Sequence, residues 1–102
     1  MARKWTAPSA EPEAYMVRHF GLETARKYAQ DDIKIAVRRR YKALTEKIRG
    51  LREKIAAIER SDSAYDERVT YYTSLGALYA QLGRAATSLA ELLTEFPDAE
   101  SY

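Results

Sequence analysis

The apolar residues between positions 37 and 58 follow an unbroken heptad pattern. They are spaced alternately by four and three residues, and the set is Val37, Tyr41, Leu44, Ile48, Leu51, Ile55 and Ile58. This spacing places one narrow apolar seam along a helix that packs against a partner helix. The spacing continues toward the N-terminus, with one stutter, as far as Leu22. We therefore predict a single helix over about 22–60, continuous through Asp31 and Asp32.

A second long helix is predicted over about 64–95. It ends before Phe96-Pro97, because proline cannot continue a helix. This helix carries two overlapping heptad seams, which are Tyr72, Leu75, Tyr79, Leu82, Ala86, Leu89, Leu93, Phe96 and Tyr71, Leu75, Leu78, Leu82, Ala85, Leu89, Leu92, Phe96. A face this wide needs two helical neighbours. We expect Tyr72 and Tyr79 to lie in the core of the chain, and the other seam to supply interface residues.

Residues 1–12 are predicted to form an arm without regular structure, since they contain two prolines and several small polar residues. We expect Trp5 to anchor this arm, because an indole ring offers a large contact area with few rotatable bonds. A neighbouring subunit is one place where the arm would dock. A short helix over about 13–20 follows, with Pro12 suited to its first turn and Gly21 to its end.

Together these segments predict an all-α fold. It is a long antiparallel helical hairpin, similar to a coiled coil, preceded by a short N-terminal helix and an extended N-terminal arm. The turn of the hairpin falls at 61–63, where Asp62 or Ser63 can cap the next helix. The 102 residues are one domain by length, with residues 13–102 as the helical domain.

Charge is distributed unevenly along the chain. Residues 22–60 contain twelve Lys and Arg against six Asp and Glu, a net charge of +6. Residues 61–102 contain two against seven, a net charge of −5. A basic half followed by an acidic half indicates partners, and the nearest partner for each half is the other half of the same chain.

The chain contains no cysteine, which excludes disulfides, thiolate metal sites and a cysteine nucleophile. No apolar run approaches the ~18 residues that a membrane span needs. The basic start of the sequence is not followed by the apolar segment of a signal peptide. We expect a protein of the cytoplasm, or of an assembly within a host cell or virion, that has no membrane partner and is not secreted by a signal peptide.

No group of residues has the spacing of a catalytic or metal site. His19 is the only histidine, and Gly21 interrupts the helix between it and Glu23. Paired carboxylates such as Asp31 and Asp32 are explained as caps, solvated turns or tail residues. General acids need converging side chains in a water-poor pocket, which a rod of helices does not suggest. We expect no enzyme activity, no cofactor, no metal and no small-molecule substrate.

A basic cluster in the predicted long helix is the sharpest candidate for a binding site. Its residues are Arg38, Arg39, Arg40, Lys42 and Arg49. Arg38, Lys42 and Arg49 line up along one side of the helix. Such a row can follow the phosphates of a nucleic acid with an affinity that depends on salt. The alternative is a solvated helix face, partly neutralised by Glu46, Glu53 and the acidic third helix.

The sequence predicts a structural or interaction protein. Self-association, or docking into a larger assembly, would cover the apolar surface that a two-helix hairpin leaves in water. The predicted interface residues are Trp5, Tyr65, Tyr71, Leu78, Ala85, Leu92 and Phe96. A virion, tail or filament component suits the small size by analogy. The alternatives are a nucleic-acid-binding protein that uses the basic helix, and a small helical adaptor or inhibitor of one protein target.

Overall fold

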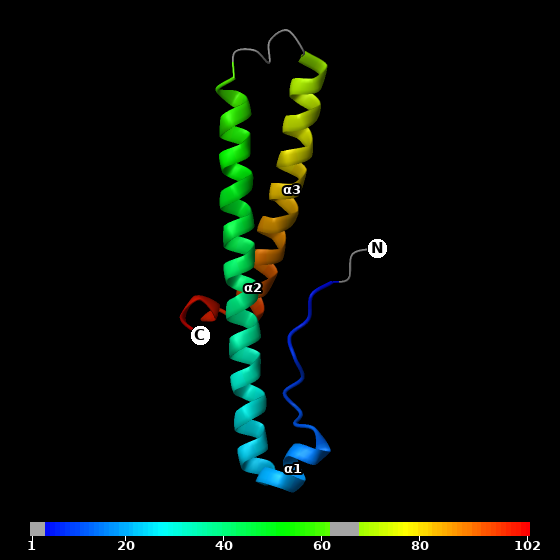
Figure 1. Ribbon diagram of the computed structural model, residues 1–102, viewed down its shortest axis with the longest axis vertical. Helices are drawn as coiled ribbons and strands as arrows, with labels where there is room; N and C mark the ends of the chain where they lie inside the picture. The colour runs from blue at the N-terminus through cyan, green and yellow to red at the C-terminus, as the bar shows by residue number, and fades with distance from the viewer. Residues whose placement is uncertain (1–3, 62–67) are drawn as a thin grey trace.

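The computed structural model describes residues 4–61 and 68–102, and within these ranges the chain forms α-helices and one short 3-10 helix. The elements are α1 at Ala14–Phe20, α2 at Leu22–Glu59, α3 at Arg68–Glu95 and η2 at Ala99–Ser101. α2 and α3 run antiparallel, side by side (Figure 1). The predicted all-α hairpin with a short N-terminal helix and an extended arm is therefore confirmed.

α2 is the continuous helix that the heptad pattern predicted. It passes through Asp31, Asp32 and Gly50 without a break, and its 38 residues give it a length of about 57 Å. The seam forms its packed side: Val37, Leu44, Leu51 and Ile55 are buried, and Tyr41, Ile48 and Ile58 are half-buried. The narrow seam needed one partner helix, and α3 is that partner.

α3 turns the seam of Ala85 and Leu92 toward α2. Both side chains are 4% exposed, whereas Tyr72 and Tyr79 on the other seam are 67% and 50% exposed. The prediction that Tyr72 and Tyr79 lie in the core is therefore wrong. In the part of the chain that the structure describes, α2 is the only long helix beside α3, so it covers only one of the two seams.

The hairpin turn cannot be compared with its prediction. The predicted turn at 61–63 and the predicted first residues of the third helix, 64–67, fall largely outside the described residues. From Arg68 onward α3 is helical, and it ends at Glu95, as the Phe96-Pro97 dipeptide predicted.

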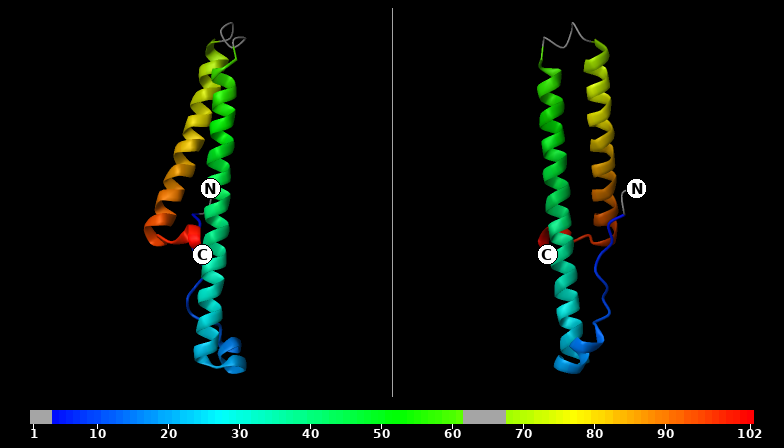
Figure 2. Two further views of the ribbon diagram at one scale, coloured as in Figure 1. Left: turned by 90° about the vertical axis from the view of Figure 1, so that its left-hand side faces the viewer. Right: turned by 45° about the vertical axis from the view of Figure 1, so that its right-hand side comes forward.

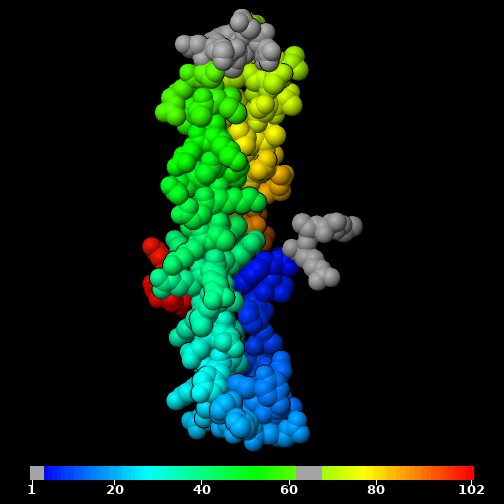
Figure 3. Space-filling model, viewed as in Figure 1, coloured from blue at the N-terminus to red at the C-terminus, as the bar shows by residue number. Residues whose placement is uncertain are grey.

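The core is centred on the middle of α2, where both ends of the chain return to it. Val37, Leu44, Leu92 and Ala99 form the buried cluster, with Trp5 and Tyr102 among the half-buried residues around it. Figure 3 shows the N-terminal arm and the C-terminal segment on opposite sides of α2.

No element was predicted after Phe96-Pro97, and the C-terminal segment is nevertheless part of the fold. After α3 the chain turns back to α2, and η2 packs against α2. Ala99 is 0% exposed and lies beside Val37 in the core. α3 itself is inclined to α2 (Figure 2), and η2 closes the core at the end of α3.

The first part of α2 extends beyond the end of α3, and α1 folds back against it (Figure 1). Gly21 joins the two helices with a φ of 85°, a backbone conformation that favours glycine. Met16 and Val17 of α1 are half-buried, while Tyr15 is exposed. The molecule measures 68 × 29 × 20 Å, and its radius of gyration is 20.0 Å. A compact domain of this length has about 13 Å, so the fold is a rod.

No helix of residues 4–61 and 68–102 combines the length and apolar character needed to cross a membrane.

Candidate interaction surfaces

The N-terminal arm is held on its own chain through Trp5. The indole is half-buried against the core, and the guanidinium carbon of Arg40 lies 5.9 Å from its ring centre. Trp5 and Arg40 also line a groove of about 690 Å³ with the C-terminal part of α3, including Glu91 and Glu95. The predicted anchoring role of Trp5 fits this position. The arm therefore docks within the chain, and no neighbouring subunit is needed to hold it.

The predicted interface seam of α3 faces α2. Ala85 and Leu92 are buried, and Tyr71, Leu78 and Phe96 are half-buried. These side chains are occupied by contacts within the chain, so they do not form a free surface. Tyr65, the remaining residue of the predicted interface, lies outside the described residues. The free surface of α3 belongs to the other seam.

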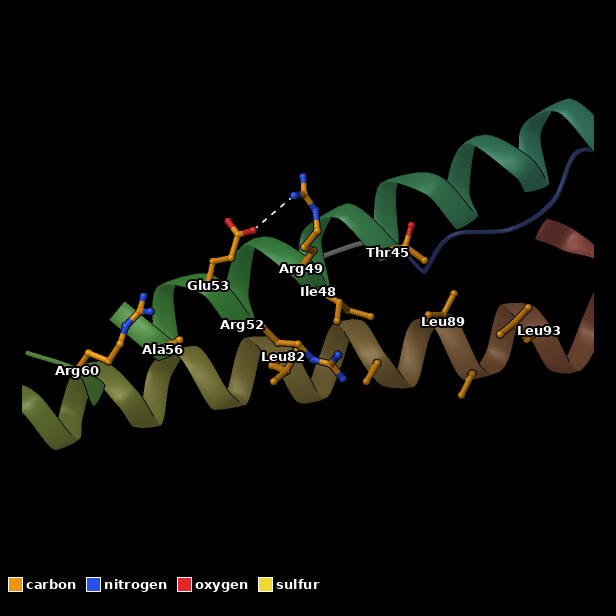
Figure 4. Close-up of a pocket in the computed structure, with 12 residues that line it drawn as sticks. Thr45, Ile48, Arg49, Arg52, Glu53, Ala56, Arg60, Leu82, Leu89 and Leu93 are labelled. Carbon is orange, nitrogen blue, oxygen red and sulfur yellow. Dashed lines mark hydrogen bonds and ion pairs between the residues drawn. The ribbon is translucent and has the colours of Figure 1, made fainter. Parts of the chain in front are cut away.

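We call Tyr72, Tyr79, Ala86 and Leu93 the open seam. They share one heptad position; Tyr72, Tyr79 and Ala86 are exposed, whereas Leu93 is half-buried beside the core cluster. Ala86 and Leu93 line a groove of about 930 Å³ between α2 and α3 (Figure 4). The groove is lined by Thr45, Ile48, Arg49, Arg52, Glu53, Ala56 and Arg60 of α2 and by Leu82, Ala86, Leu89, Ala90 and Leu93 of α3. It therefore has an apolar floor, with charged side chains on the α2 side only.

Tyr79 links the two helices beyond the groove. Its hydroxyl donates a hydrogen bond of 3.1 Å to the carboxylate of Glu59. This bond, with a smaller contribution from desolvation, raises the pKa of Tyr79 above its usual value, because the phenolate would lose the bond and face the negative carboxylate. The residue is on the surface, so the bond fixes the position of a side chain that remains half-exposed.

The basic cluster of α2 is divided among different contacts. Arg49 pairs with Glu46 at 2.7 Å and with Glu53 at 3.4 Å, and these carboxylates raise the pKa of Arg49. Arg40 is half-buried at Trp5. Of the predicted row of Arg38, Lys42 and Arg49, only Arg38 and Lys42 therefore remain without a balancing acid among the described residues, because the charge of Arg49 is balanced by two acids.

Arg38, Arg39 and Lys42 are exposed, and among the described residues none of them forms an ion pair. Arg38 donates a hydrogen bond of 2.7 Å to the backbone carbonyl oxygen of Tyr102. Lys34, four residues earlier, lies 5.9 Å from the centre of the Tyr102 ring. Two cations of α2 therefore contact the last residue of the C-terminal segment, and this segment also carries Asp98 and Glu100.

A second exposed apolar surface lies at the end of the rod that carries α1. We call it the distal patch, and its residues are Tyr15, Phe20, Leu22, Tyr28 and Ile35, each between 44% and 58% exposed. Tyr28 and Ile35 are seven residues apart on one side of α2, in the part that α3 does not reach. Phe20 contacts Tyr28 edge to face, with ring centres 5.3 Å apart.

Chemistry-bearing side chains do not converge in the described part of the chain. No three His, Cys, Asp or Glu residues there are arranged to hold a metal ion. His19 is exposed and stands edge to face with Phe20, 4.6 Å between ring centres. The grooves between the helices are the features that offer a binding surface.

No model of a known protein family matches the chain, and comparison with curated proteins and with solved structures finds no match. The fold thus defines the class, an all-α rod with a helical hairpin, without a relative to add to it.

The open seam was missed as a surface, although a signal for it exists in the sequence. Residues 69–83 contain no charged residue. A helix that packs on one partner normally carries charges on its outer side. Four turns without any charge therefore mark a helix whose outer side is also apolar or small, and Val69, Tyr72 and Tyr79 are the large side chains exposed on it.

Proposed function

We propose that the protein is a non-enzymatic helical subunit of a larger assembly, in which copies of the chain associate with one another. The outer side of α3 carries this proposal. Val69 and Tyr72 are 82% and 67% exposed in the charge-free stretch 69–83. Large exposed side chains along a charge-free stretch of helix favour a protein contact over exposure to water.

The distal patch supports the same conclusion from the opposite end of the rod. Tyr28 and Ile35 are 45% and 51% exposed on α2, and Tyr15 on α1 is 58% exposed. A rod with one apolar surface near each end can place the two surfaces of neighbouring copies against each other. Antiparallel pairs would satisfy both surfaces in a closed dimer, and a staggered arrangement would continue as a filament.

The test is light scattering on a sizing column with wild-type protein and two charge variants. We expect the wild type to have a mass that is a multiple of 11.7 kDa. Tyr72→Glu and Ile35→Glu should each weaken association at least about tenfold, because each places a carboxylate in an apolar contact. The matched controls are Thr87→Glu on α3 and Ala43→Glu on α2, which add the same charge at exposed positions outside both surfaces.

A wild-type protein that is monomeric at every soluble concentration would refute self-association. So would control variants that weaken association as much as Tyr72→Glu and Ile35→Glu. Leu78, a predicted interface residue, is unsuitable for this test because it is half-buried on the side that faces α2.

Nucleic-acid binding is a second candidate function, favoured by the exposed cations Arg39 and Lys42. Neither forms an ion pair with another described residue. Recording absorbance at 260 and 280 nm on the same column, at low and moderate salt, tests it. Copurified nucleic acid that is released as salt rises, and that is absent from an Arg39→Glu, Lys42→Glu double variant, would favour this function. A protein-like absorbance ratio at low salt would exclude it.

A further inference from the structure

The groove between α2 and α3 has two chemically different walls. The α3 wall carries only uncharged side chains, with Leu82, Leu89 and Leu93 as its large residues. The α2 wall carries cations around Ile48 and Ala56. An occupant of this groove therefore meets an apolar floor and one positively charged edge.

The positive charge of that edge is not balanced within the groove. Glu53 is the only acid that lines it, and this carboxylate is paired with Arg49. Arg52 and Arg60 form no ion pair among the residues that the structure describes. Figure 4 shows Arg52 reaching across toward α3 near Leu82, while Arg49 and Glu53 point away from α3. Arg52 is thus a cation placed over an apolar surface, where a carboxylate partner would be partly shielded from water.

We propose that this groove binds an amphipathic helix of another protein, one whose apolar stripe is bordered on one flank by Asp or Glu. Helices bind such grooves through apolar side chains one turn apart. From Thr45 to Arg60 the groove follows α2 for about 22 Å, which matches a helix of roughly four turns. The acidic flank would lie along Arg52 and Arg60, where charge complementarity fixes the direction and register of the helix.

Within residues 4–61 and 68–102, a second copy of the chain does not offer a helix of this kind. Its own acidic helical segment contains Glu91 and Glu95, but Leu92 between them is 4% exposed and belongs to the core of that copy. In the distal patch, Tyr28 and Ile35 are accompanied by both acids and cations, namely Asp31, Asp32, Lys27 and Lys34. The described helices of a second copy therefore lack an apolar stripe with an acidic flank, which favours a different protein as the partner. The inference does not rest on self-association, since it is argued from the groove lining and Arg52, whereas self-association is argued from Val69, Tyr72 and the distal patch. Ala86 belongs to both the groove and the open seam, so the effect of Ala86→Trp is interpreted together with the mass of the protein.

The experiment measures binding of two synthetic peptides to the full chain by fluorescence anisotropy. Each peptide is a helix of about 18 residues with the same leucine stripe, and its flank carries either glutamate or lysine. We expect the glutamate peptide to bind at least about tenfold more tightly than the lysine peptide. Arg52→Glu should reverse this preference, and Ala86→Trp, which fills the groove, should abolish binding of both.

The matched control is Arg39→Glu, which makes the same charge change on α2 outside the groove and should leave both affinities unchanged. Circular dichroism checks that each variant keeps its helices. Equal binding of the two peptides, no binding of either, or the same effect from Arg52→Glu and Arg39→Glu would overturn the proposal. A wild-type oligomer that Ala86→Trp dissociates would also overturn it, since the groove would then hold a second copy. Self-association is tested by a separate measurement, the mass of the wild type and of Tyr72→Glu and Ile35→Glu, so failure of that proposal can be distinguished from failure of this one.

Discussion

The guanidinium group of Arg40 lies over the ring of Trp5, 5.9 Å from the ring centre to the guanidinium carbon. This contact joins residues that are far apart in the sequence, and it ties the N-terminal arm to the middle of α2. Trp5 also packs on the core cluster that contains Val37 and Leu92. The arm is therefore a structural part of the rod and helps to cover the end of α3.

Removing the arm contact should destabilise the protein measurably. We expect Trp5→Ala to lower the free energy of unfolding by about 1–2 kcal/mol, because a half-buried indole and its cation contact are lost. Urea unfolding followed by circular dichroism measures this. Trp5 is the only tryptophan, so its fluorescence reports on the contact directly: Arg40→Ala should shift the emission to longer wavelength, whereas Arg39→Ala should not. An unchanged emission in Arg40→Ala would contradict the contact.

The heptad pattern of α2 was sufficient to predict its packed side. Val37, Leu44 and Leu51 form a single seam with charged residues around it, so only one side of that helix could be buried. The same reasoning failed for α3, because its two seams differ by one residue in register and have similar apolar character. The choice between them depends on the core at the end of α3, where Leu92 packs with Ala99. That contact forms only because the chain turns back after Pro97. A heptad pattern describes the sides of a helix, so it cannot predict this turn.

One substitution made at two valines tests the position of the core. Val37 is 0% exposed and Val69 is 82% exposed. We expect Val37→Ala to lower the free energy of unfolding by about 2–3 kcal/mol, from lost apolar burial and the cavity left behind. Val69→Ala should change it by less than about 0.5 kcal/mol. Chemical denaturation at low protein concentration, where association does not contribute, provides both values, and similar effects at the two positions would contradict the packing described.

The C-terminal segment should respond to mutation as a core element. Ala99 is 0% exposed, and its neighbour Ser101 in the same 3-10 helix is exposed. We expect Ala99→Asp to destabilise the protein by at least about 2 kcal/mol, because a carboxylate without a partner enters the core. Ser101→Asp adds the same charge to the segment and should have little effect. Thermal unfolding of the two variants separates a docked segment from a solvated tail, for which both substitutions would be equally mild.

The basic cluster shows how much of a binding surface can be predicted from sequence alone. The five cations were visible as a cluster, and Glu46 and Glu53 were predicted to neutralise it in part. The contacts of Arg38 and Arg40 were not visible, because each depends on a segment that is distant in the sequence. Arg40 meets Trp5, Arg38 meets the carbonyl of Tyr102, and Arg49 is balanced by two glutamates. Helical spacing gives the direction of a side chain from the axis, but it does not show which chain segment will lie there.

The hydrogen bond from Tyr79 to Glu59 predicts a specific response to alkaline pH. The neutral phenol is the form that donates this bond, so the pKa of Tyr79 is higher in the folded chain than in the unfolded chain. The stabilising contribution is therefore complete below the unfolded pKa of about 10 and is lost as the pH rises through the folded pKa. Glu59→Gln should lower the titration midpoint of Tyr79, measured by NMR of the tyrosine Cζ carbon.

Glu53→Gln removes a carboxylate of α2 that pairs with Arg49, so it should leave that midpoint where it is in the wild type. If Glu59→Gln leaves the midpoint unchanged, or the two variants shift it equally, Tyr79 is not held by Glu59 and its half-exposed position at the open seam needs another cause.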